Sequence, residues 1–541
     1  MIKVKNQTIS ALLENSFQLY ADKTALSYVD GKSYTYSELK LEIERVRNIL
    51  IGLGVQKGDR VAILSRNMPN WGISFMAITT MGATVVPMLP DFHENEIQNI
   101  IEHSGSNIIF VSKLMFPKLE KIGSELLKTI IITDDLSIER SSPLHSSEQK
   151  IEPVNEDDIA SIIYTSGTTG KSKGVMLTHK NIVNNAIQVL SIEPVNSSHS
   201  FLSILPLSHT YENTLGFILP LMQGASIYYL DKPPTATVLL PALKIVRPTH
   251  ILSVPMVIEK IYRNQILPKF TKGKLISTLY KVSFIRKFLN KIAGKKLMET
   301  FGGNLKFFGV GGAPLDPTVE KFLRESKFPY AIGYGLTESA PLLSGANPSQ
   351  VRLRATGPVL KGVQVKINNP DPVTGEGEIW AKGDNIMKGY YKEPQITSEV
   401  LTPDGWLKTG DLGYFDKDNY LFIRGRLKNM IIGASGENIY PEEIESVINN
   451  FKYVVESVVV EQKGRLVALV HFNQEELEKL FHEFKEEAIQ YINQKIDELT
   501  IELQEYVNSR VNKFSRLNAV VAYSTPFEKT ATHKIKRYLY Y

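Results

Sequence analysis

Residues 164–175 read Tyr164-Thr165-Ser166-Gly167-Thr168-Thr169-Gly170-Lys171-Ser172-Lys173-Gly174-Val175, and an apolar, strand-like run over residues 159–164 leads into them. The segment combines three glycines, two lysines and five Ser or Thr hydroxyl groups. Glycines let backbone N–H groups converge on an anion, hydroxyl groups add donors, and lysines supply positive charge. The segment therefore predicts a phosphate-binding loop after a buried strand, with a helix beginning after a cap at Thr178.

This loop differs from a Walker A loop at one position. The pattern G-x-x-x-x-G-K-[ST], aligned on Gly170-Lys171-Ser172, requires a glycine at position 165, and Thr165 stands there. Loops rich in Ser, Thr and Gly are often plain linkers. The two lysines and the apolar segments on both sides favour phosphate binding over that alternative.

Composition narrows the class of protein. A chain of 541 residues exceeds the size of a single core, so two or more folding units are expected. The 62 basic and 57 acidic residues are nearly balanced and do not indicate a nucleic-acid partner. The absence of cysteine excludes disulfides, thiolate metal ligands and a cysteine nucleophile. The N-terminus lacks the apolar core of a signal peptide, which predicts a cytoplasmic location.

Apolar strand-like runs alternate with amphipathic helical patterns in the first part of the chain. Runs at residues 60–64, 107–111 and 129–133 are each followed or preceded by such a pattern, which is typical of parallel sheets covered by helices. The charge-free segment 71–90 contains Gly82, Pro87 and Pro90 and predicts a buried helix followed by a buried strand, not a membrane span. Residues 201–230 predict a strand, a loop and a helix around a pocket.

The pattern of residues along the chain changes at two later points. After about residue 357, short strands and turn signals predict a β-rich portion. A smaller unit is expected to begin near Arg426, with a helix opening at Pro441 and a long charged helical region over residues 474–512. The predicted fold is therefore α/β, with a large N-terminal domain over residues 1–426 and a smaller α+β domain over residues 427–541.

Residues 263–296 contain ten Lys or Arg residues and no acid, interleaved with large apolar side chains. A basic amphipathic stretch of this kind can lie on an anionic membrane surface. It can also form a solvated helix pair whose apolar side packs on the domain. The sequence leaves both interpretations open, and it leaves the oligomeric state open as well.

Several later motifs fit a nucleotide. Small residues at Gly311-Gly312-Ala313-Pro314 allow a flat ring to approach the backbone, and Gly333-Tyr334-Gly335-Leu336-Thr337-Glu338 offers an aromatic ring, a hydroxyl and a carboxylate suited to Mg²⁺. Thr409-Gly410-Asp411 offers a carboxylate for ribose hydroxyls, and Arg424-Gly425-Arg426-Leu427-Lys428 offers cations. The segment 529–537 offers lysines that can reach a site from the second unit.

These motifs, taken in order, resemble the motif series of the adenylate-forming superfamily, which contains acyl-CoA synthetases, luciferases and peptide-synthetase adenylation domains. The resemblance implies a large N-terminal domain of two helix-covered sheets and a β-barrel portion, with a mobile C-terminal domain. It also implies ATP, Mg²⁺ and CoA as ligands. In the implied reaction, a carboxylate attacks the α-phosphate of ATP, pyrophosphate leaves, and the acyl-adenylate is passed to a thiol.

The resemblance also implies a role for each matching residue. The pyrophosphate would be held by Thr165, Ser166, Gly167, Thr168, Thr169 and Lys173, and the adenine by Gly312, Ala313, Pro314 and Tyr334. Thr337 would bind the α-phosphate, Glu338 and Thr165 would bind Mg²⁺, and Asp411 and Arg426 would bind the ribose. Lys534 would stabilise the transition state of adenylation. Lys428 would be the hinge about which the C-terminal domain turns, bringing Gly433 and Gly436 to the site for the thiol step.

Two positions depart from a simple assignment. His533 stands before Lys534 where the superfamily usually has glycine, and Lys529 and Lys536 lie nearby; the neighbouring isoleucine and arginine favour Lys534. His209, in Leu205-Pro206-Leu207-Ser208-His209-Thr210-Tyr211-Glu212, would lie near the thioester-forming centre or serve as a structural hydrogen-bonding group.

The motif set is most similar to bacterial long-chain fatty acyl-CoA synthetases, which predicts a long-chain fatty acid as the substrate and peripheral contact with an anionic membrane as an option. Medium-chain or aryl acids, a carrier protein as acceptor, and a non-catalytic nucleotide-binding regulator at membranes are the alternatives.

Overall fold

Two eight-stranded sheets form the larger part of the computed structural model, which describes residues 6–123, 125–141, 152–166, 172–271, 274–433, 437–479, 487–530 and 534–541. The first sheet has the order β15-β14-β13-β12-β10-β11-β1-β2. Its strands are β1 (Thr24–Tyr28), β2 (Ser33–Thr35), β10 (Ser200–Ser203), β11 (Ser226–Tyr229), β12 (His250–Ser253), β13 (Phe307–Val310), β14 (Tyr330–Gly335) and β15 (Leu342–Gly345). Its central pairs are parallel, and β2 and β15 close its edges in the antiparallel sense.

The second sheet has the order β18-β9-β8-β4-β3-β5-β6-β7. Its strands are β3 (Arg60–Leu64), β4 (Thr84–Met88), β5 (Ile108–Val111), β6 (Thr129–Ile132), β7 (Ser137–Arg140), β8 (Ile159–Ser166), β9 (Ser172–Thr178) and β18 (Gly389–Tyr390). Every residue of β4, β5 and β6 is buried, as expected for parallel strands covered on both faces. The sequence-based predictions of strands at 60–64, 107–111 and 129–133 are confirmed to within a residue.

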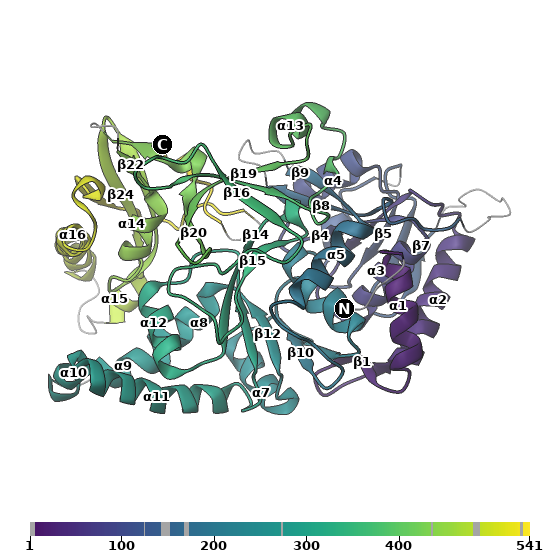
Figure 1. Ribbon diagram of the computed structural model, residues 1–541, viewed down its shortest axis with the longest axis horizontal. Coiled ribbons are helices and arrows are strands. Elements are labelled where there is room, and N and C mark those ends of the chain that lie inside the picture. Colours follow the sequence, from purple (N-terminus) through teal and green to yellow (C-terminus); the bar gives the residue numbers. More distant parts are fainter. Residues whose placement is uncertain are drawn as a thin grey trace.

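Helices cover both sheets (Figure 1). Those of the N-terminal part are α1 (Ile9–Leu19), α2 (Tyr36–Gly52), α3 (Pro69–Thr80), α4 (Glu94–Ser104), α5 (His179–Val189), α6 (Leu219–Met222), α7 (Ala236–Val246), α8 (Pro255–Ile261), α9 (Leu267–Thr271), α10 (Lys274–Lys281), α11 (Ser283–Thr300), α12 (Pro317–Ser326) and α13 (Pro394–Val400). Two short 3₁₀ turns are η1 (Phe116–Leu119) and η4 (Thr337–Ser339), and η2 (Glu212–Ile218) and η3 (Tyr262–Ile266) are π-helices. Thr178 caps α5 in a capping box with Asn181, as predicted.

Helix α3 is buried on nearly all sides because it packs between the two sheets. The Trp71 ring stacks on Phe75 at 5.4 Å and meets the edge of Phe217, from η2, at 6.0 Å. A Cβ added at Gly72 would lie 2.7 Å from the Phe217 ring, so a glycine is needed where α3 and η2 touch. This packing explains why residues 71–90 carry no charge, and it confirms the predicted buried helix and strand.

The β-rich portion is a four-stranded antiparallel sheet of order β16-β17-β19-β20. Its strands are β16 (Gln364–Asn368), β17 (Gly377–Lys382), β19 (Leu407–Phe415) and β20 (Leu421–Arg426). Isolated bridges, Ser344 with Val359 and Gly357 with Leu421, connect it to β15. Its last paired residue is Arg426, which lies opposite Asp411.

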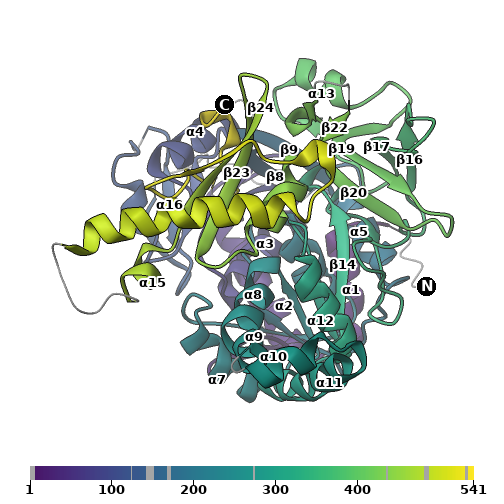
Figure 2. The ribbon, with the colours of Figure 1, turned by 90° about the vertical axis from the view of Figure 1, so that its left-hand side faces the viewer.

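The C-terminal part has a separate core. Its elements are η5 (Leu427–Asn429), β21 (Ile431–Ile432), β22 (Asn438–Ile439), α14 (Pro441–Ile448), β23 (Val454–Gln462), β24 (Arg465–Phe472), α15 (Gln474–Lys479), α16 (Glu487–Asn508), η6 (Lys513–Ser515), β25 (Ala519–Ala522) and η7 (Arg537–Leu539). Residues Ile444, Val470 and Leu503 belong to one buried cluster beneath the sheet β23-β24-β25. Helix α16 lies along the outside of this part (Figure 2).

Polar contacts join the C-terminal part to the rest of the chain. The Tyr440 hydroxyl donates to Glu376 at 2.7 Å, and the Arg424 guanidinium pairs with Glu443 at 3.0 Å. Among the described residues, the helices are too short or too polar to cross a lipid bilayer.

Candidate active site

The carboxyl ends of β12, β13 and β14 meet at one edge of the first sheet, where open α/β sheets commonly bind ligands. The loop after β13 places Gly312, Ala313 and Pro314 at the surface. Gly312 has φ +83°, and a Cβ added there would have no neighbour closer than 3.8 Å. The loop therefore offers an open backbone surface beside Tyr334, as the sequence predicts for a flat ring.

Tyr334, Asp411 and Arg426 are joined by direct contacts. The Tyr334 hydroxyl donates to Asp411 Oδ2 at 2.7 Å, and Arg426 Nε lies 2.8 Å from Asp411 Oδ1. Asp411 and Arg426 face each other across β19 and β20, while Tyr334 comes from β14. Burial raises the pKa of the Asp411 carboxyl, and the Arg426 charge opposes that effect. Residues that the sequence predicted separately thus form one cluster.

Lys534 reaches this cluster from the C-terminal end of the chain. The residue as a whole is exposed, but its ammonium group is shielded from water. This desolvation is the main cause of a lowered pKa of Lys534, and the Arg426 charge lowers the pKa further. Asp411 and Glu338 are close enough to raise it. The two competing lysines are engaged elsewhere, since Lys529 pairs with Glu456 and Lys536 with Glu528. The structure therefore brings Lys534, and not its neighbours, to the cluster.

Glu338 lies in η4, which begins two residues after the end of β14. The Tyr390 hydroxyl donates to Glu338 Oε1 at 2.8 Å, and the Lys173 ammonium lies 5.3 Å from the centre of the Tyr390 ring. Lys173 in turn pairs with Thr165 across β8 and β9. Thr337 precedes Glu338 in the same turn. The ends of β8 and β9 and the turn η4 therefore meet around Tyr390.

Some predicted residues are placed elsewhere or are not described. Gly167, Thr168, Thr169 and Gly436, and the side chain of Ser166, lie outside the described residues. Lys428 is an exposed residue of η5, directly after the strand that carries Arg426. The Gly433 N–H donates to the Glu437 carbonyl at 2.8 Å, between β21 and β22.

His209 lies at the start of the turn that leads into η2. The Tyr211 N–H donates to His209 Nδ1 at 3.2 Å, so the neutral ring carries its hydrogen on Nε2. Burial lowers the pKa of His209 to about 4, and the Lys534 charge lowers it in the same direction. The ring is therefore neutral at pH 7 and lies close to Lys534.

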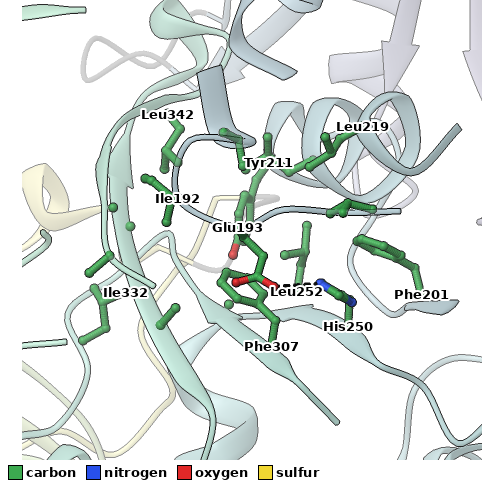
Figure 3. A pocket seen from close by; sticks show the side chains of 18 residues that line it. Ile192, Glu193, Phe201, Tyr211, Leu219, His250, Leu252, Phe307, Ile332 and Leu342 are labelled. Atoms are coloured by element: carbon green, nitrogen blue, oxygen red, sulfur yellow. Dashed lines mark ion pairs between the residues drawn. The ribbon is translucent and has the colours of Figure 1, made fainter. Parts of the chain in front are cut away.

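An apolar cavity lies between the end of α5, η2 and strands β10, β12, β13, β14 and β15 (Figure 3). Gly333, beside Tyr334, lies at one end of its lining. The cavity has a volume of about 50 Å³. The cavity is lined mainly by apolar side chains, including Ile192, Phe201, Tyr211, Leu215, Leu252 and Phe307.

Two polar side chains face each other at the inner end of this cavity. His250 Nε2 lies 3.4 Å from Glu193 Oε1 without a hydrogen bond to it, and only 1% of His250 is exposed. The His250 ring stacks on Phe201 at 4.6 Å, and its Nδ1 is 2.9 Å from Thr249 Oγ1. We call Glu193 and His250 the cavity floor.

A family model described as "AMP-binding enzyme" matches residues 13–391, more than half of the chain. The chain belongs to the AMP-binding enzyme family. This family is part of the adenylate-forming superfamily. The matched residues include every strand of both large sheets, among them β18, whose Tyr390 contacts Glu338.

Relatives of this AMP-binding protein include ligases of different acids. It is 30% identical over 465 residues to 4-coumarate–CoA ligase 3 of Arabidopsis thaliana, covering 81% of this chain and 77% of the relative. It is 28% identical over 467 residues to fatty acyl-CoA synthetase A of Dictyostelium discoideum, covering 77% of this chain and 68% of the relative.

Solved structures share the fold. ATP-bound MatB from Rhodopseudomonas palustris matches with a TM-score of 0.77 at 23% identity, covering 99% of this chain and 98% of that one. The o-succinylbenzoate CoA synthetase MenE from Bacillus subtilis, solved with ATP and magnesium, matches with a TM-score of 0.77 at 24% identity, covering 97% of this chain and 98% of that one. These likenesses confirm the predicted α/β fold with a smaller C-terminal domain.

Sequence reasoning missed three features of this part of the protein. Tyr390, which orients Glu338, lies in the short run Gly389-Tyr390-Tyr391, and that run alone signals no chemistry. The floor pair, Glu193 and His250, comes from segments far apart in the chain, so that no local pattern joins them. Glu212 lies in the same segment as His209, residues 205–212, and it is buried. Nothing in the sequence indicates that burial.

Proposed function

We propose that this chain is an AMP-forming acyl-CoA ligase that activates an apolar carboxylic acid. In the first step, the carboxylate attacks the α-phosphate of ATP, an acyl-adenylate forms, and pyrophosphate leaves. In the second step, the CoA thiol loses its proton to water and its sulfur attacks the acyl carbonyl carbon. A thioester forms, and AMP leaves with the electron pair of the broken bond. The observation that carries the proposal is the convergence of Lys534 with Tyr334, Asp411, Arg426 and Glu338.

The cluster is chemically suited to a nucleotide. Asp411 accepts a hydrogen bond from Tyr334 and forms an ion pair with Arg426, and both contacts hold it in place. Its remaining lone pairs can accept hydrogen bonds from ribose hydroxyls. The Tyr334 ring and the loop at Gly312, Ala313 and Pro314 would hold the adenine. Thr337 would bind the α-phosphate, and Thr165, Ser166, Gly167, Thr168, Thr169 and Lys173 would hold the pyrophosphate as it leaves.

Lys534 and His209 would act where the two substrates meet. A fixed ammonium beside the α-phosphate stabilises the negative charge that develops there during attack. His209 is neutral at pH 7 and so adds no second positive charge beside Lys534. Its Nε2–H would donate a hydrogen bond to the acid or to the acyl carbonyl.

The residues present fit a magnesium ion that arrives with ATP. Mg²⁺ is commonly held by one or two carboxylates together with substrate phosphate oxygens. Glu338 and Thr165 would supply the protein oxygens, and no group of three or more metal-binding side chains exists among the described residues. When bound, the ion would neutralise charge on the phosphates.

The second step would use a different arrangement of the C-terminal residues 427–541. Lys534 occupies the cluster in the structure, so a thiol approaching from that side needs this lysine to leave. Lys428, in the turn η5 that follows β20, would be the hinge. Turning about it would bring Gly433 and Gly436 to the site.

The sequence predicts a long-chain fatty acid as the substrate, and the apolar lining of the cavity supports an apolar acid. The cavity floor favours a second candidate, a medium-chain or aryl acid. The lining spans His250 to Leu252 on β12 and Phe307 to Gly309 on β13, roughly 7 Å at about 3.3 Å per residue. A long alkyl chain would fit only if Glu193 and His250 moved apart.

Pyrophosphate release from ATP, measured with saturated fatty acids of graded length and with aryl acids, tests the proposal. Each acid is assayed with and without CoA, and thioester formation is followed separately. A maximum among long chains supports the sequence prediction, whereas a maximum among short or aryl acids transfers the assignment to the second candidate.

Two other outcomes would contradict the proposal. Pyrophosphate release without any CoA thioester, together with transfer to a carrier protein, would indicate a carrier-directed ligase. No acid-dependent pyrophosphate release at all would favour a non-catalytic nucleotide-binding regulator.

A further inference from the structure

Helices α10 and α11 carry a row of large apolar side chains that face solvent. Phe284 is 81% exposed and Phe288 60% exposed, and Ile292 continues the row at the same four-residue spacing with 44%. Ile276, Leu279 and Val282 extend it through α10 and the turn, with exposures of 42%, 40% and 50%. We call these six residues the α10–α11 face. Clustered exposure of this kind marks an interaction surface, unlike single exposed apolar residues.

A row of lysines runs beside the apolar row. Lys287, Lys291 and Lys295 are exposed and follow one another at the same four-residue spacing in α11. Each lies three residues after a member of the apolar row, which places the two rows about 60° apart around the helix. Lys281 and Lys296 add two further exposed lysines at the ends.

The opposite side of α11 is fixed to the protein. Arg286 pairs with Glu325 of α12 at 3.0 Å, and Asn290 donates to the same carboxylate at 2.8 Å. A Cβ added at Gly294 would lie 2.4 Å from the Ser326 carbonyl oxygen, so α11 and α12 touch through their backbones. The Tyr280 hydroxyl donates to Asn290 at 2.7 Å and joins α10 to α11. Helix α11 therefore packs on the protein through one side only, and the α10–α11 face stays exposed to solvent.

Basic residues dominate the surroundings of this face. Within residues 274–300, Glu299 is the one acidic residue, and Glu325 on α12 is engaged by Arg286. The neighbouring surface of α12 adds Lys321, Arg324 and Lys327. In both views the helices lie at the periphery of the molecule, where a flat surface can reach them (Figures 1 and 2).

We propose that the α10–α11 face binds the anionic surface of a lipid bilayer, with its apolar side chains in the interfacial region and its lysines at the head groups. Aromatic and aliphatic residues beside a row of lysines are what an amphipathic helix needs to lie in that interface. A second copy of the chain fits less well, because a symmetric contact through this face would bring two rows of lysines together. The proposal concerns a surface separate from the nucleotide cluster.

Co-sedimentation of the full-length protein with vesicles tests this surface. Vesicles of phosphatidylcholine with about one third phosphatidylglycerol are compared with pure phosphatidylcholine. We expect binding to the anionic vesicles, weakening as salt is raised. Lys287→Glu combined with Lys291→Glu should lower the partition coefficient by at least about tenfold, and Phe284→Ser combined with Phe288→Ser should lower it at every salt concentration.

Matched changes elsewhere serve as controls. Lys361→Glu with Lys417→Glu alters the same charge on another exposed surface, and Val373→Ser removes an apolar side chain that is 91% exposed. Both should bind vesicles like the unchanged protein, and all variants should keep the activity measured with a soluble acid. Binding that is equal in every variant, or equal on neutral and anionic vesicles, overturns the proposal. Loss of a dimer in the Phe284→Ser, Phe288→Ser variant, without any vesicle binding, also overturns it, in favour of self-association.

Discussion

Glu212 is a buried carboxyl group three residues beyond His209. Only 2% of it is exposed; the Ser203 hydroxyl donates to its Oε1 at 2.6 Å, and its Oε2 has no hydrogen-bond partner in the part of the chain that the structure describes. Burial raises the pKa of Glu212 to about 8, so the group is protonated and neutral at pH 7. Because the protonated Glu212 side chain carries no net charge, it does not change the electrostatic potential around Lys534 and His209.

This protonation predicts a particular dependence of stability on pH. Between the ordinary glutamate pKa, about 4.3, and the raised pKa of about 8, the folded protein holds a proton that the unfolded chain has released. The free energy of unfolding should therefore fall as pH rises through this range, by at most about 1.4 kcal/mol per pH unit. Below the range, the group adds no slope.

Glu212→Gln keeps the shape and removes the titration. Denaturant unfolding of both proteins at a series of pH values should show that the difference in stability between them grows in favour of the variant as pH rises towards 8. Parallel pH profiles for the two proteins would mean that Glu212 is not protonated in the fold.

The cavity floor is a feature of paired elements, because β12 supplies His250 and the segment after α5 supplies Glu193. His250→Ala would remove the ring between Phe201 and Phe307 and open space beyond the present end of the cavity. We expect the preferred acid to become longer by several carbons, with kcat/KM for the longer acids raised relative to shorter ones. A matched change outside the cavity, His471→Ala, should leave the order of preference unchanged.

The measurement is kcat/KM across a series of fatty acids of graded length for both variants. Since His250 is buried, thermal unfolding should be recorded alongside to show that the variant is folded. An unchanged order of preference in a folded His250→Ala protein would mean that the floor does not limit chain length.

Elements were more predictable than the contacts between them. Buried strands such as β3 and β4 follow from uninterrupted apolar runs, and α5 follows from its cap at Thr178 and its helical periodicity. The π-helical geometry of η2 has no such signal in its residues. The meeting of Glu193 with His250 depends on how β12 lies against the end of α5, and local patterns carry no information about that register.

At the scale of the whole molecule, the C-terminal part contributes one lysine, Lys534, to the nucleotide cluster of the larger part. The sequence favours Lys534 through its neighbours alone, and it cannot show which lysine of 529, 534 and 536 faces the nucleotide cluster. The fold separates them, because Glu456 and Glu528 engage the other two while Lys534 lies among Arg426, Asp411 and Glu338. The nucleotide cluster itself was predictable as a set of motifs, but its hydrogen bonds were not.

The most direct test separates the two chemical steps in Lys534→Ala and in the control Lys536→Ala. Acid-dependent pyrophosphate release measures adenylation, and conversion of a supplied acyl-adenylate to the CoA thioester measures the second step. We expect Lys534→Ala to lose at least about 100-fold in adenylation while the second step stays near the unchanged protein, and we expect Lys536→Ala to keep both. Undiminished adenylation in Lys534→Ala, or its loss in Lys536→Ala, would contradict the assignment of this cluster as the adenylating site.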